Sequence, residues 1–196
     1  MCIRDREILD FRKAEDAGFS HTHIRRVSVS SLLRTQFEWF YPLSEQHQIQ
    51  FKIDAPKELY WNTDSVYFKK ILANLISNAF KYTEDGGTVR ISLHEEENFL
   101  VLKVYNTGKG IEEADMQNIF DRYRILGTMD NDDNRQNTAR NGLGLFICHS
   151  LVQSLGGKID IESEVGQYAE FTVTLPFGIV EESSDDTIDE DIPVSL

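Results

Sequence analysis

Hydrophobic residues recur along this chain at two different spacings. Spacings of three and four residues, typical of amphipathic helices, predict helices over residues 30–48, 65–83, 111–123 and 141–157. Alternation of apolar and polar residues predicts half-buried strands in five shorter segments, and a sixth apolar stretch is interpreted as another short strand. The predicted strands cover residues 49–54, 58–63, 88–94, 99–105, 158–164 and 170–177.

Small polar residues and glycines mark the ends of these elements. Ser30 or Ser31 is expected to cap the first helix and Asp64 the second, because such side chains accept hydrogen bonds from the free N–H groups of a helix start. Gly156 and Gly157 are expected to end the last helix. The strands are grouped mainly in hairpins, so the sheet should be mixed and mostly antiparallel. We therefore predict an α+β fold, a two-layer sandwich with helices on one face of the sheet.

The chain is strongly acidic, with a formal net charge of −13. Seven acidic residues between positions 181 and 191 have no Lys or Arg among them, and they account for −7, which leaves −6 for the rest. This charge argues against nucleic acid as a partner, because phosphate binding needs clustered Lys and Arg. No apolar run approaches the roughly 18 residues that a membrane span requires. We therefore expect this domain to contact neither nucleic acid nor membrane.

The two cysteines give no sign of a disulfide. Cys2 lies at the extreme N-terminus and Cys148 lies inside an apolar helical pattern. A reducing, cytoplasmic compartment is therefore expected for this domain. Two cysteines so placed also cannot assemble a metal cluster of the Cys/His kind.

Several polar side chains share one face of the predicted helix 65–83. Asn74, Asn78 and Lys81 are spaced i, i+4 and i+7, with Tyr82 beside them. Asn in mid-helix costs about half a kcal/mol against Ala, so two of them one turn apart suggest a compensating use. An amide oxygen can complete an octahedral Mg²⁺ shell, and a lysine can contact a phosphate. A solvated helix face is the ordinary alternative.

Two glycine-rich segments and one long polar segment complete the candidate chemistry. Residues 106–111, NTGKGI, contain Gly108 and Gly110, which allow the backbone to approach a ligand closely. Residues 141–145, NGLGL, open a helix whose free N–H groups form a natural phosphate seat. Residues 124–140 have the length and polarity of a lid. Singly, these segments are also explained as a turn, a glycine-rich helix start and a disordered stretch.

Together, the order and spacing of these segments resemble the catalytic, ATP-binding domain of sensor histidine kinases. NLISNAFKYT, NTGKGI, IFDRYR and NGLGLFICHSLVQSLGGKIDIES resemble the N, G1, F and G2 boxes of that family. The family belongs to the Bergerat ATP-binding superfamily, so the resemblance implies a Bergerat fold with a long ATP lid over residues 27–177. Residues 1–26 then resemble the remnant of a dimerisation helix or linker from a hybrid sensor, behind a non-native MCIRDR start. Residues 178–196 are expected to be an acidic, disordered tail or linker.

The resemblance also implies roles for individual residues, with ATP and Mg²⁺ as cofactors. Asn78 would coordinate Mg²⁺, and Phe120 would pack the lid. The implied catalytic residues are Asn78, Lys81, Arg122 and Arg124. The implied ATP-binding residues are Asn74, Asn78, Lys81, Tyr82, Asn106, Gly108, Gly110, Ile111, Phe120, Gly142, Leu143, Gly144 and Leu145.

Three features depart from the family pattern. Asn106 replaces the aspartate that reads the adenine amino group, which should cost about 1 kcal/mol because hydrogen bonds to neutral groups are weaker than those to charged ones. Since an amide can also donate, we hypothesise that Asn106 relaxes discrimination of adenine over guanine. Arg140 stands where the family usually has the first glycine of its second box. None of the five histidines has the sequence surroundings of a phosphoacceptor.

The resemblance implies a domain that donates the γ-phosphoryl group of ATP to a histidine on a dimerisation domain outside this sequence. Its expected partners are that domain, in a homodimeric full-length protein, and a response regulator or receiver domain. The full-length protein is expected to be anchored in the inner membrane. One alternative is a degenerate regulatory module that binds nucleotide without phosphotransfer. Another is an ATP-hydrolysing machine of the gyrase kind, which would carry a glutamate where this chain has Asn74.

Overall fold

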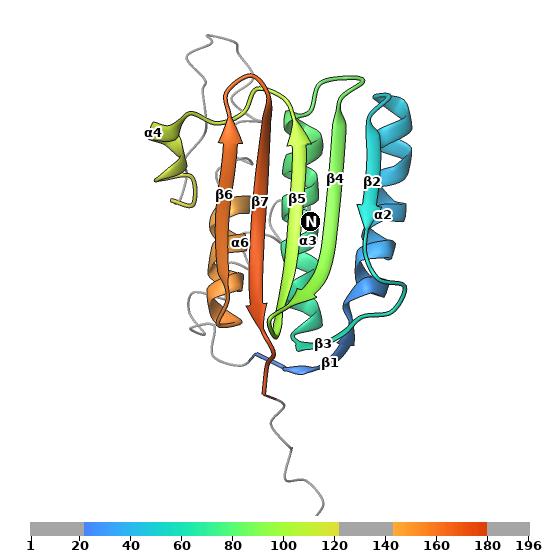
Figure 1. The fold of residues 1–196 in the computed structure, drawn as a ribbon, viewed down its shortest axis with the longest axis vertical. Helices are drawn as coiled ribbons and strands as arrows, with labels where there is room; N and C mark the ends of the chain where they lie inside the picture. The colour runs from blue at the N-terminus through green and yellow to red at the C-terminus, as the bar shows by residue number, and fades with distance from the viewer. Residues whose placement is uncertain (1–21, 122–142, 180–196) are drawn as a thin grey trace, which may run out of the picture.

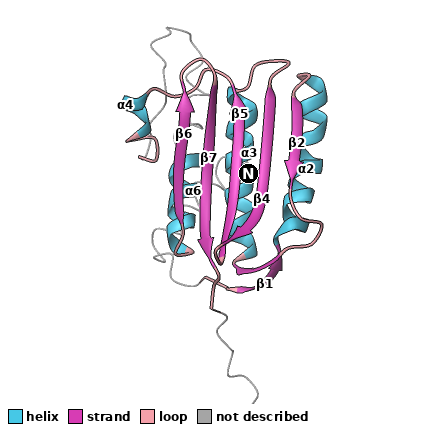
Figure 2. Cartoon of the chain, in the orientation of Figure 1, coloured by secondary structure: helices cyan, strands magenta, loops and turns pink. Residues whose placement is uncertain are grey.

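The computed structural model describes residues 22–121 and 143–179 (Figure 1). The helices in this part of the chain are α2 (Val29–Gln46), α3 (Ser65–Tyr82), α4 (Glu113–Met116) and α6 (Gly144–Ser154). The strands are β1 (Arg25–Ser28), β2 (Gln50–Asp54), β3 (Tyr60–Thr63), β4 (Thr88–Glu96), β5 (Phe99–Thr107), β6 (Lys158–Glu164) and β7 (Tyr168–Pro176). The three long helices lie on one face of the main sheet, and no described helix covers its other face (Figure 2).

Five strands form one mixed sheet in the order β2-β4-β5-β7-β6. β2 runs parallel to β4, whereas every other neighbouring pair in this sheet is antiparallel. β1 and β3 form a separate antiparallel pair at one end of the domain. This arrangement confirms the predicted α+β sandwich with a mixed, mostly antiparallel sheet.

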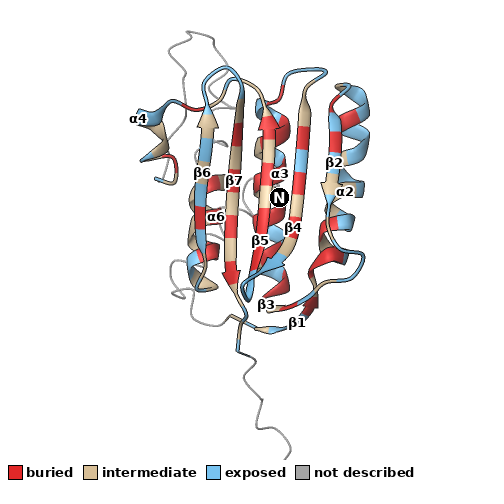
Figure 3. Ribbon diagram, in the orientation of Figure 1, coloured by how far each residue is buried: buried red, intermediate tan, exposed pale blue. Residues whose placement is uncertain are grey.

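The hydrophobic core fills the space between the sheet and the helices (Figure 3). Along β5, Leu100, Leu102 and Val104 are at most 1% exposed and alternate with more accessible residues, so one face of the strand is buried against the helices. The opposing stripe of α3 consists of Phe68, Ile71, Leu72, Leu75, Ile76 and Ala79. This packing holds α3 along the middle of the sheet, which fixes where its polar side chains lie.

The start of α3 confirms Asp64 as its cap. The Asp64 carboxylate accepts hydrogen bonds from the backbone N–H groups of Val66 and Tyr67, at 2.8 and 3.1 Å. Its second oxygen accepts from the backbone N–H of His23 at 2.9 Å. One buried side chain therefore joins the incoming chain to the helix.

The predicted cap of α2 is wrong. The helix begins at Val29, and its N-cap residue Ser28 makes no side-chain capping hydrogen bond. The backbone carbonyl of Leu59 instead accepts from the N–H of Val29 at 3.0 Å, and the hydroxyl of buried Ser30 accepts from the N–H of Leu59 at 2.9 Å. A tertiary contact with the segment before β3 therefore replaces the expected local cap.

The predicted helix over residues 111–123 is also wrong in length. Only the single turn of α4 is helical among the described residues of this segment. The N–H of Ile111 donates to the Ser163 hydroxyl at 2.9 Å, and the Ile111 side chain is 8% exposed. This anchor holds the start of the segment against the β6–β7 hairpin.

Candidate functional site

Helix α3 presents two half-buried amides and two exposed side chains along the predicted face. Asn74 and Asn78 lie in its middle, one turn apart, and neither side chain makes a hydrogen bond within the described ranges. Among those residues the Thr63 hydroxyl is the only side-chain group that is both fully buried and without a partner. The amide groups of Asn74 and Asn78 are therefore not fully buried with respect to the described residues. Amide oxygens without a hydrogen-bond partner among the described residues are potential metal ligands, and the amide N–H groups could donate to a phosphate.

Lys81 and Tyr82 form the C-terminal end of this face. The Lys81 Nζ donates to the Tyr82 hydroxyl at 3.1 Å and lies 4.5 Å from the centre of its ring. Both side chains are exposed, so this contact costs little to rearrange. A phosphate near the end of α3 would meet a lysine that has no carboxylate partner among the described residues.

The first turn of α6 comes against the same face of α3. A Cβ placed on Gly144 would lie 3.6 Å from the Asn74 side-chain oxygen, which is ordinary contact distance. Leu145 is 9% exposed and belongs to the core, whereas Leu143 is half-buried and its carbonyl accepts from the N–H of Ile147 at 2.9 Å. The first N–H groups of α6, which have no partner within a helix, therefore start close to Asn74.

Asn106 lies at the end of the buried stripe of β5. It pairs in register with Val89 on one side and Ala169 on the other, and it is only 4% exposed. Its Nδ2 donates to the backbone carbonyl of Thr107 at 3.1 Å, which leaves Oδ1 as the acceptor. The Thr107 hydroxyl in turn accepts from the N–H of Thr88 at 2.8 Å.

Thr107 was not selected from the sequence as a site residue. It fixes the orientation of Asn106 through its backbone carbonyl, and its side chain joins the ends of β4 and β5. The carbonyl contact leaves no signal in the sequence because every residue has a carbonyl.

The glycine loop 107–111 packs against the protein's own backbone. A Cβ on Gly108 would lie 2.1 Å from the carbonyl oxygen of Tyr82, and one on Gly110 would lie 2.2 Å from that of Glu164. The N–H of Gly108 also donates to the Gln167 carbonyl at 3.0 Å. The glycines therefore allow the loop backbone to contact the end of α3 and the β6–β7 turn. At these two positions the missing side chains do not leave room for a ligand.

Phe120 packs between α6 and the sheet. Its ring stacks on His149 with centres 5.3 Å apart and meets Phe171 edge-on at 6.5 Å. His149 is thus a packing residue of α6, and its Nε2 lies 3.2 Å from the Gln153 side-chain nitrogen. Phe120 ties the segment after α4 to α6.

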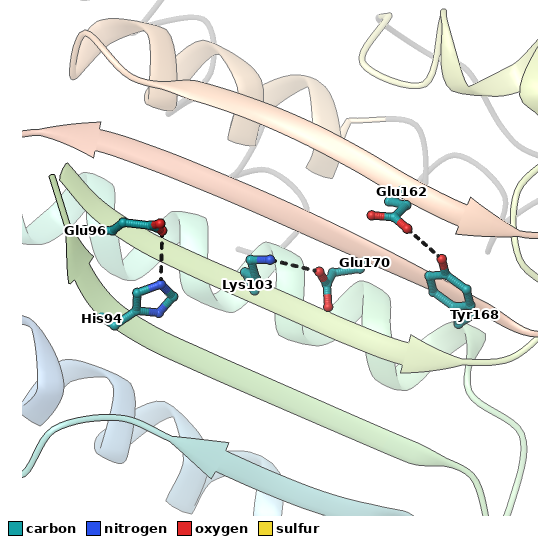
Figure 4. Close-up of polar contacts among 6 residues, drawn as sticks. All are labelled: His94, Glu96, Lys103, Glu162, Tyr168 and Glu170. Carbon is teal, nitrogen blue, oxygen red and sulfur yellow. Dashed lines mark hydrogen bonds and ion pairs between the residues drawn. The ribbon is translucent and has the colours of Figure 1, made fainter.

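The open face of the sheet has a different character, because several of its polar groups are paired with one another (Figure 4). The Lys103 Nζ lies 3.4 Å from a Glu170 carboxylate oxygen, and the Tyr168 hydroxyl donates to Glu162 at 2.9 Å. The hydrogen bond to Glu162 raises the pKa of the Tyr168 hydroxyl, as do its partial burial and the nearby carboxylates. Asn74 and Asn78 of α3, whose amides have no partner among the described residues, lie on the side of the sheet that the helices cover, away from this network.

No group of three or more His, Cys, Asp or Glu is placed to hold a metal ion in the part of the chain that the structure describes. Cys148 on α6 is fully buried, and burial raises the pKa of its thiol well above the usual range. A thiol in this state is a poor metal ligand and a poor nucleophile. The candidate chemistry therefore belongs to neutral amides, backbone N–H groups and Lys81.

The structure brings two of the selected segments against helix α3. Asn74 meets Gly144, and Gly108 meets both Tyr82 and Asn106, so the start of α6 and the end of β5 both contact α3. Arg122, Arg124 and Gly142 lie outside the described residues, as does the predicted lid 124–140.

A family model described as histidine kinase-, DNA gyrase B-, and HSP90-like ATPase matches residues 63–179. The sensor histidine kinase WalK of Bacillus subtilis is 33% identical over 177 residues, which cover 88% of this chain and 27% of WalK. The chain thus spans about a quarter of the length of this relative.

Solved structures give the same picture of the fold. The catalytic domain of the histidine kinase ThkA, free of nucleotide, matches with a TM-score of 0.67 at 24% identity, covering 79% of this chain and 95% of that domain. ThkA in complex with the response regulator TrrA matches with a TM-score of 0.67 at 20% identity, covering 89% of this chain and 49% of ThkA. Full-length ShkA in complex with AMPPNP matches with a TM-score of 0.68 at 26% identity, covering 80% of this chain and 32% of ShkA.

Proposed function

The chain belongs to the family of histidine kinase-, DNA gyrase B- and HSP90-like ATPases, as the ATP-binding domain of a sensor histidine kinase, and from this premise we propose its activity. The domain binds Mg·ATP and donates the γ-phosphoryl group to a histidine on a dimerisation domain in two-component signalling. The observation that carries the proposal is that the start of α6 and the Asn106 loop both contact α3, the helix that bears Asn74 and Asn78.

The donor set of the site fits Mg²⁺ only when nucleotide is present. Mg²⁺ prefers oxygen ligands in an octahedron and usually keeps waters while it binds one or two protein groups and substrate phosphates. Asn78 offers one neutral amide oxygen. Asn74, which lies one helical turn away, offers a second amide oxygen. Neutral ligands cannot replace the charge of a carboxylate cluster, so the phosphates must supply the negative charge. The bound metal would neutralise charge that develops on the phosphates during transfer.

The remaining residues bind and orient the nucleotide. Lys81, at the end of α3, contacts phosphate as a point charge. The free N–H groups at the start of α6, around Leu143, Gly144 and Leu145, receive phosphate oxygens. Gly142 is proposed as a further phosphate contact. Asn106 accepts a hydrogen bond from the base through Oδ1, because Thr107 already holds its Nδ2. Arg122 and Arg124 are proposed as further phosphate contacts.

Two other functions are weighed against this one. A water-activating glutamate one turn before Asn78 would favour ATP hydrolysis of the gyrase kind, but that position holds Asn74. A regulatory module without phosphotransfer is motivated by Asn106 and Arg140. It is opposed by the retention of Asn74, Asn78 and Lys81 on one face of α3. A phosphoacceptor histidine in the longer protein, upstream of this domain, distinguishes the kinase from the regulatory module.

The proposed partners follow from the same premise. They are the dimerisation domain, in a homodimeric longer protein, and a response regulator or receiver domain. No described helix is both long and apolar enough to cross a membrane. Separately from that finding, membership in the sensor histidine kinase family motivates the proposal that the longer protein is anchored in the inner membrane.

Calorimetric titration of the chain with ADP tests nucleotide binding. We expect saturable binding that weakens at least tenfold, about 1.4 kcal/mol, when EDTA replaces Mg²⁺, because the phosphates and metal bind together. A titration with Mg²⁺ alone should show no comparable binding. The absence of ADP binding, or binding unaffected by EDTA, would contradict the proposed site.

Asn106 should set a modest preference for adenine. Reading guanine requires Nδ2 to face the base, so the amide must give up its hydrogen bond to the Thr107 carbonyl. A neutral hydrogen bond contributes roughly 0.5–1.5 kcal/mol, so we expect ADP to bind about 2- to 15-fold more tightly than GDP.

Competition calorimetry with ADP and GDP measures this preference in the wild-type chain and in Asn106→Asp. The aspartate variant should bind ADP several-fold more tightly and discriminate more strongly, since a carboxylate only accepts. A wild-type preference above about a hundredfold, near 2.7 kcal/mol, contradicts relaxed discrimination by Asn106.

A further inference from the structure

A pocket of about 410 Å³ lies at the end of the domain where β3, the β4–β5 turn and the end of β7 come together (Figure 1). It is lined by Trp61 of β3, Glu95 of β4, Asn98 of the turn and Phe177, which follows β7. Small-ligand sites usually have volumes of about 300–1,000 Å³, so the pocket is large enough to hold a ligand. We call it the Trp61 pocket.

The Trp61 pocket is separate from the base-reading part of the proposed nucleotide site. Asn98 immediately precedes β5, whereas Asn106 lies near the end of that strand. Eight residues of extended strand span about 26 Å, so a ligand in the pocket does not reach Asn106. The inference drawn from this pocket is therefore independent of the proposed nucleotide binding.

Glu95 occupies a core-facing position of β4 although it is charged. Ile91 and Leu93 are fully buried, and since side chains alternate along a strand, Glu95 points to the same side. Glu96, the next residue, points to the open face of the sheet, where its carboxylate lies 3.6 Å from the His94 Nε2 (Figure 4). An exposed acid therefore stands at the point where the core stripe of β4 ends.

Phe177 continues the core-facing side of β7 in the same way. Val173 and Leu175 are buried at the two preceding positions of that side, whereas Phe177 is 54% exposed. Its ring meets the ring of Trp61 edge-on, with centres 5.0 Å apart. The indole N–H of Trp61 donates to the Pro176 carbonyl at 2.9 Å, which holds the indole in place. The pocket thus has one fixed aromatic ring and a second ring that is largely open to solvent.

The polar groups of the pocket have no partner among the described residues. Neither the Glu95 carboxylate nor the Asn98 amide forms an ion pair or a side-chain hydrogen bond there. The described lining also contains no Lys or Arg. Aromatic rings attract a cation through their faces, and a carboxylate adds a charge-assisted hydrogen bond. The lining therefore suits a cationic group.

We propose that the Trp61 pocket binds the guanidinium group of an arginine side chain on a protein partner. A guanidinium is planar, stacks on aromatic rings and is more weakly hydrated than an ammonium, so it suits this lining better than a lysine does. Its N–H groups donate to the Glu95 carboxylate and to the Asn98 side-chain oxygen. The described lining has no cation to pair with the α-carboxylate of free arginine, so the fitting ligand is a side chain within a peptide.

Titration followed by NMR of the full chain tests this binding. The sequence has two tryptophans, and Trp39→Phe identifies the indole N–H signal of Trp61. The probe is N-acetyl-arginine N-methylamide, for which we expect a saturable shift of that signal with a Kd on the order of 1 mM, as suits a ligand of this size. The corresponding citrulline amide has the same shape without the charge and should bind at least about fivefold more weakly.

Two acids near the same turn provide a matched pair of variants. At about 0.15 M salt, where exposed charges beyond roughly 8 Å are screened, Glu95→Gln should weaken binding of the arginine probe about fivefold. Glu97→Gln removes an exposed acid that does not line the pocket, and it should change the affinity by less than about twofold. Phe177→Leu keeps an apolar contact with Trp61 but removes the ring, and it should weaken binding about two- to fivefold.

Three results overturn the proposal. The first is the absence of a saturable shift of the Trp61 indole signal. The second is equal binding of the arginine and citrulline amides, or equal weakening by Glu95→Gln and Glu97→Gln. The third is tighter binding of free arginine than of the capped amide, which would assign the pocket to a small molecule instead of a protein partner.

Discussion

Replacing Gly108 with alanine should lower the free energy of unfolding by about 3–5 kcal/mol, from backbone strain together with overpacking. The new Cβ would lie 2.1 Å from the Tyr82 carbonyl oxygen, and the φ of Gly108 is +153°, which L-residues rarely adopt. The loop cannot simply move away, because the Gly108 N–H is bonded to the Gln167 carbonyl. Thermal unfolding should therefore show a melting temperature lower by roughly 6–20 °C.

Gly166 offers a matched control for this substitution. Its φ is +76°, but a Cβ there would meet nothing within 4 Å. Gly166→Ala should thus cost only the conformational penalty of about 1–2 kcal/mol for a left-handed L-residue. Equal losses of melting temperature in the two variants would show that strain alone matters, and that the close approach to Tyr82 does not.

The elements with strong local patterns were predicted well from the sequence. Asp64 caps α3, and the alternating segments 88–94 and 99–105 form the hairpin β4–β5. In these places the local preference and the buried face agree, so the tertiary structure adds packing without changing the element. The helices on one face of a mixed sheet follow from this agreement.

Elements that depend on distant contacts were missed or misplaced. β1 is four residues long and is defined by pairing with β3, more than thirty residues away. The start of α2 is set by the carbonyl of Leu59, and the segment after Gly110 is set by Ser163. No local propensity encodes a hydrogen bond to a partner so far along the chain.

The residues of the candidate site were predictable as types, whereas their geometry was not. The spacing of Asn74 and Asn78 placed both on one face of a helix, as the structure shows. The glycine pattern predicted a close backbone approach, but the structure shows that Gly108 approaches Tyr82 and not an open space. The orientation of Asn106 depends on the Thr107 carbonyl, which sequence patterns do not distinguish.

Asn78→Ala should weaken Mg²⁺-dependent ADP binding by about 10- to 100-fold or more, because even outer-shell partners of a metal contribute that much and Asn78 is the proposed direct ligand. The fold should survive, since Ala is the better mid-helix residue by about half a kcal/mol and the half-buried Asn78 side chain has no hydrogen bond within the described ranges. Calorimetry with ADP in Mg²⁺ and in EDTA, together with thermal unfolding, measures both effects.

The EDTA arm separates a metal ligand from a residue that merely shapes the pocket. Loss of the metal ligand affects binding only when Mg²⁺ is present, so in EDTA the wild-type chain and Asn78→Ala should bind ADP with similar affinities. Gln36→Ala removes another half-buried amide from the middle of a helix, on α2, and should leave the affinity unchanged in both conditions. Wild-type affinity of Asn78→Ala in Mg²⁺ would remove Asn78 from the metal site. An equal loss in Mg²⁺ and EDTA would instead make it a contact of the nucleotide.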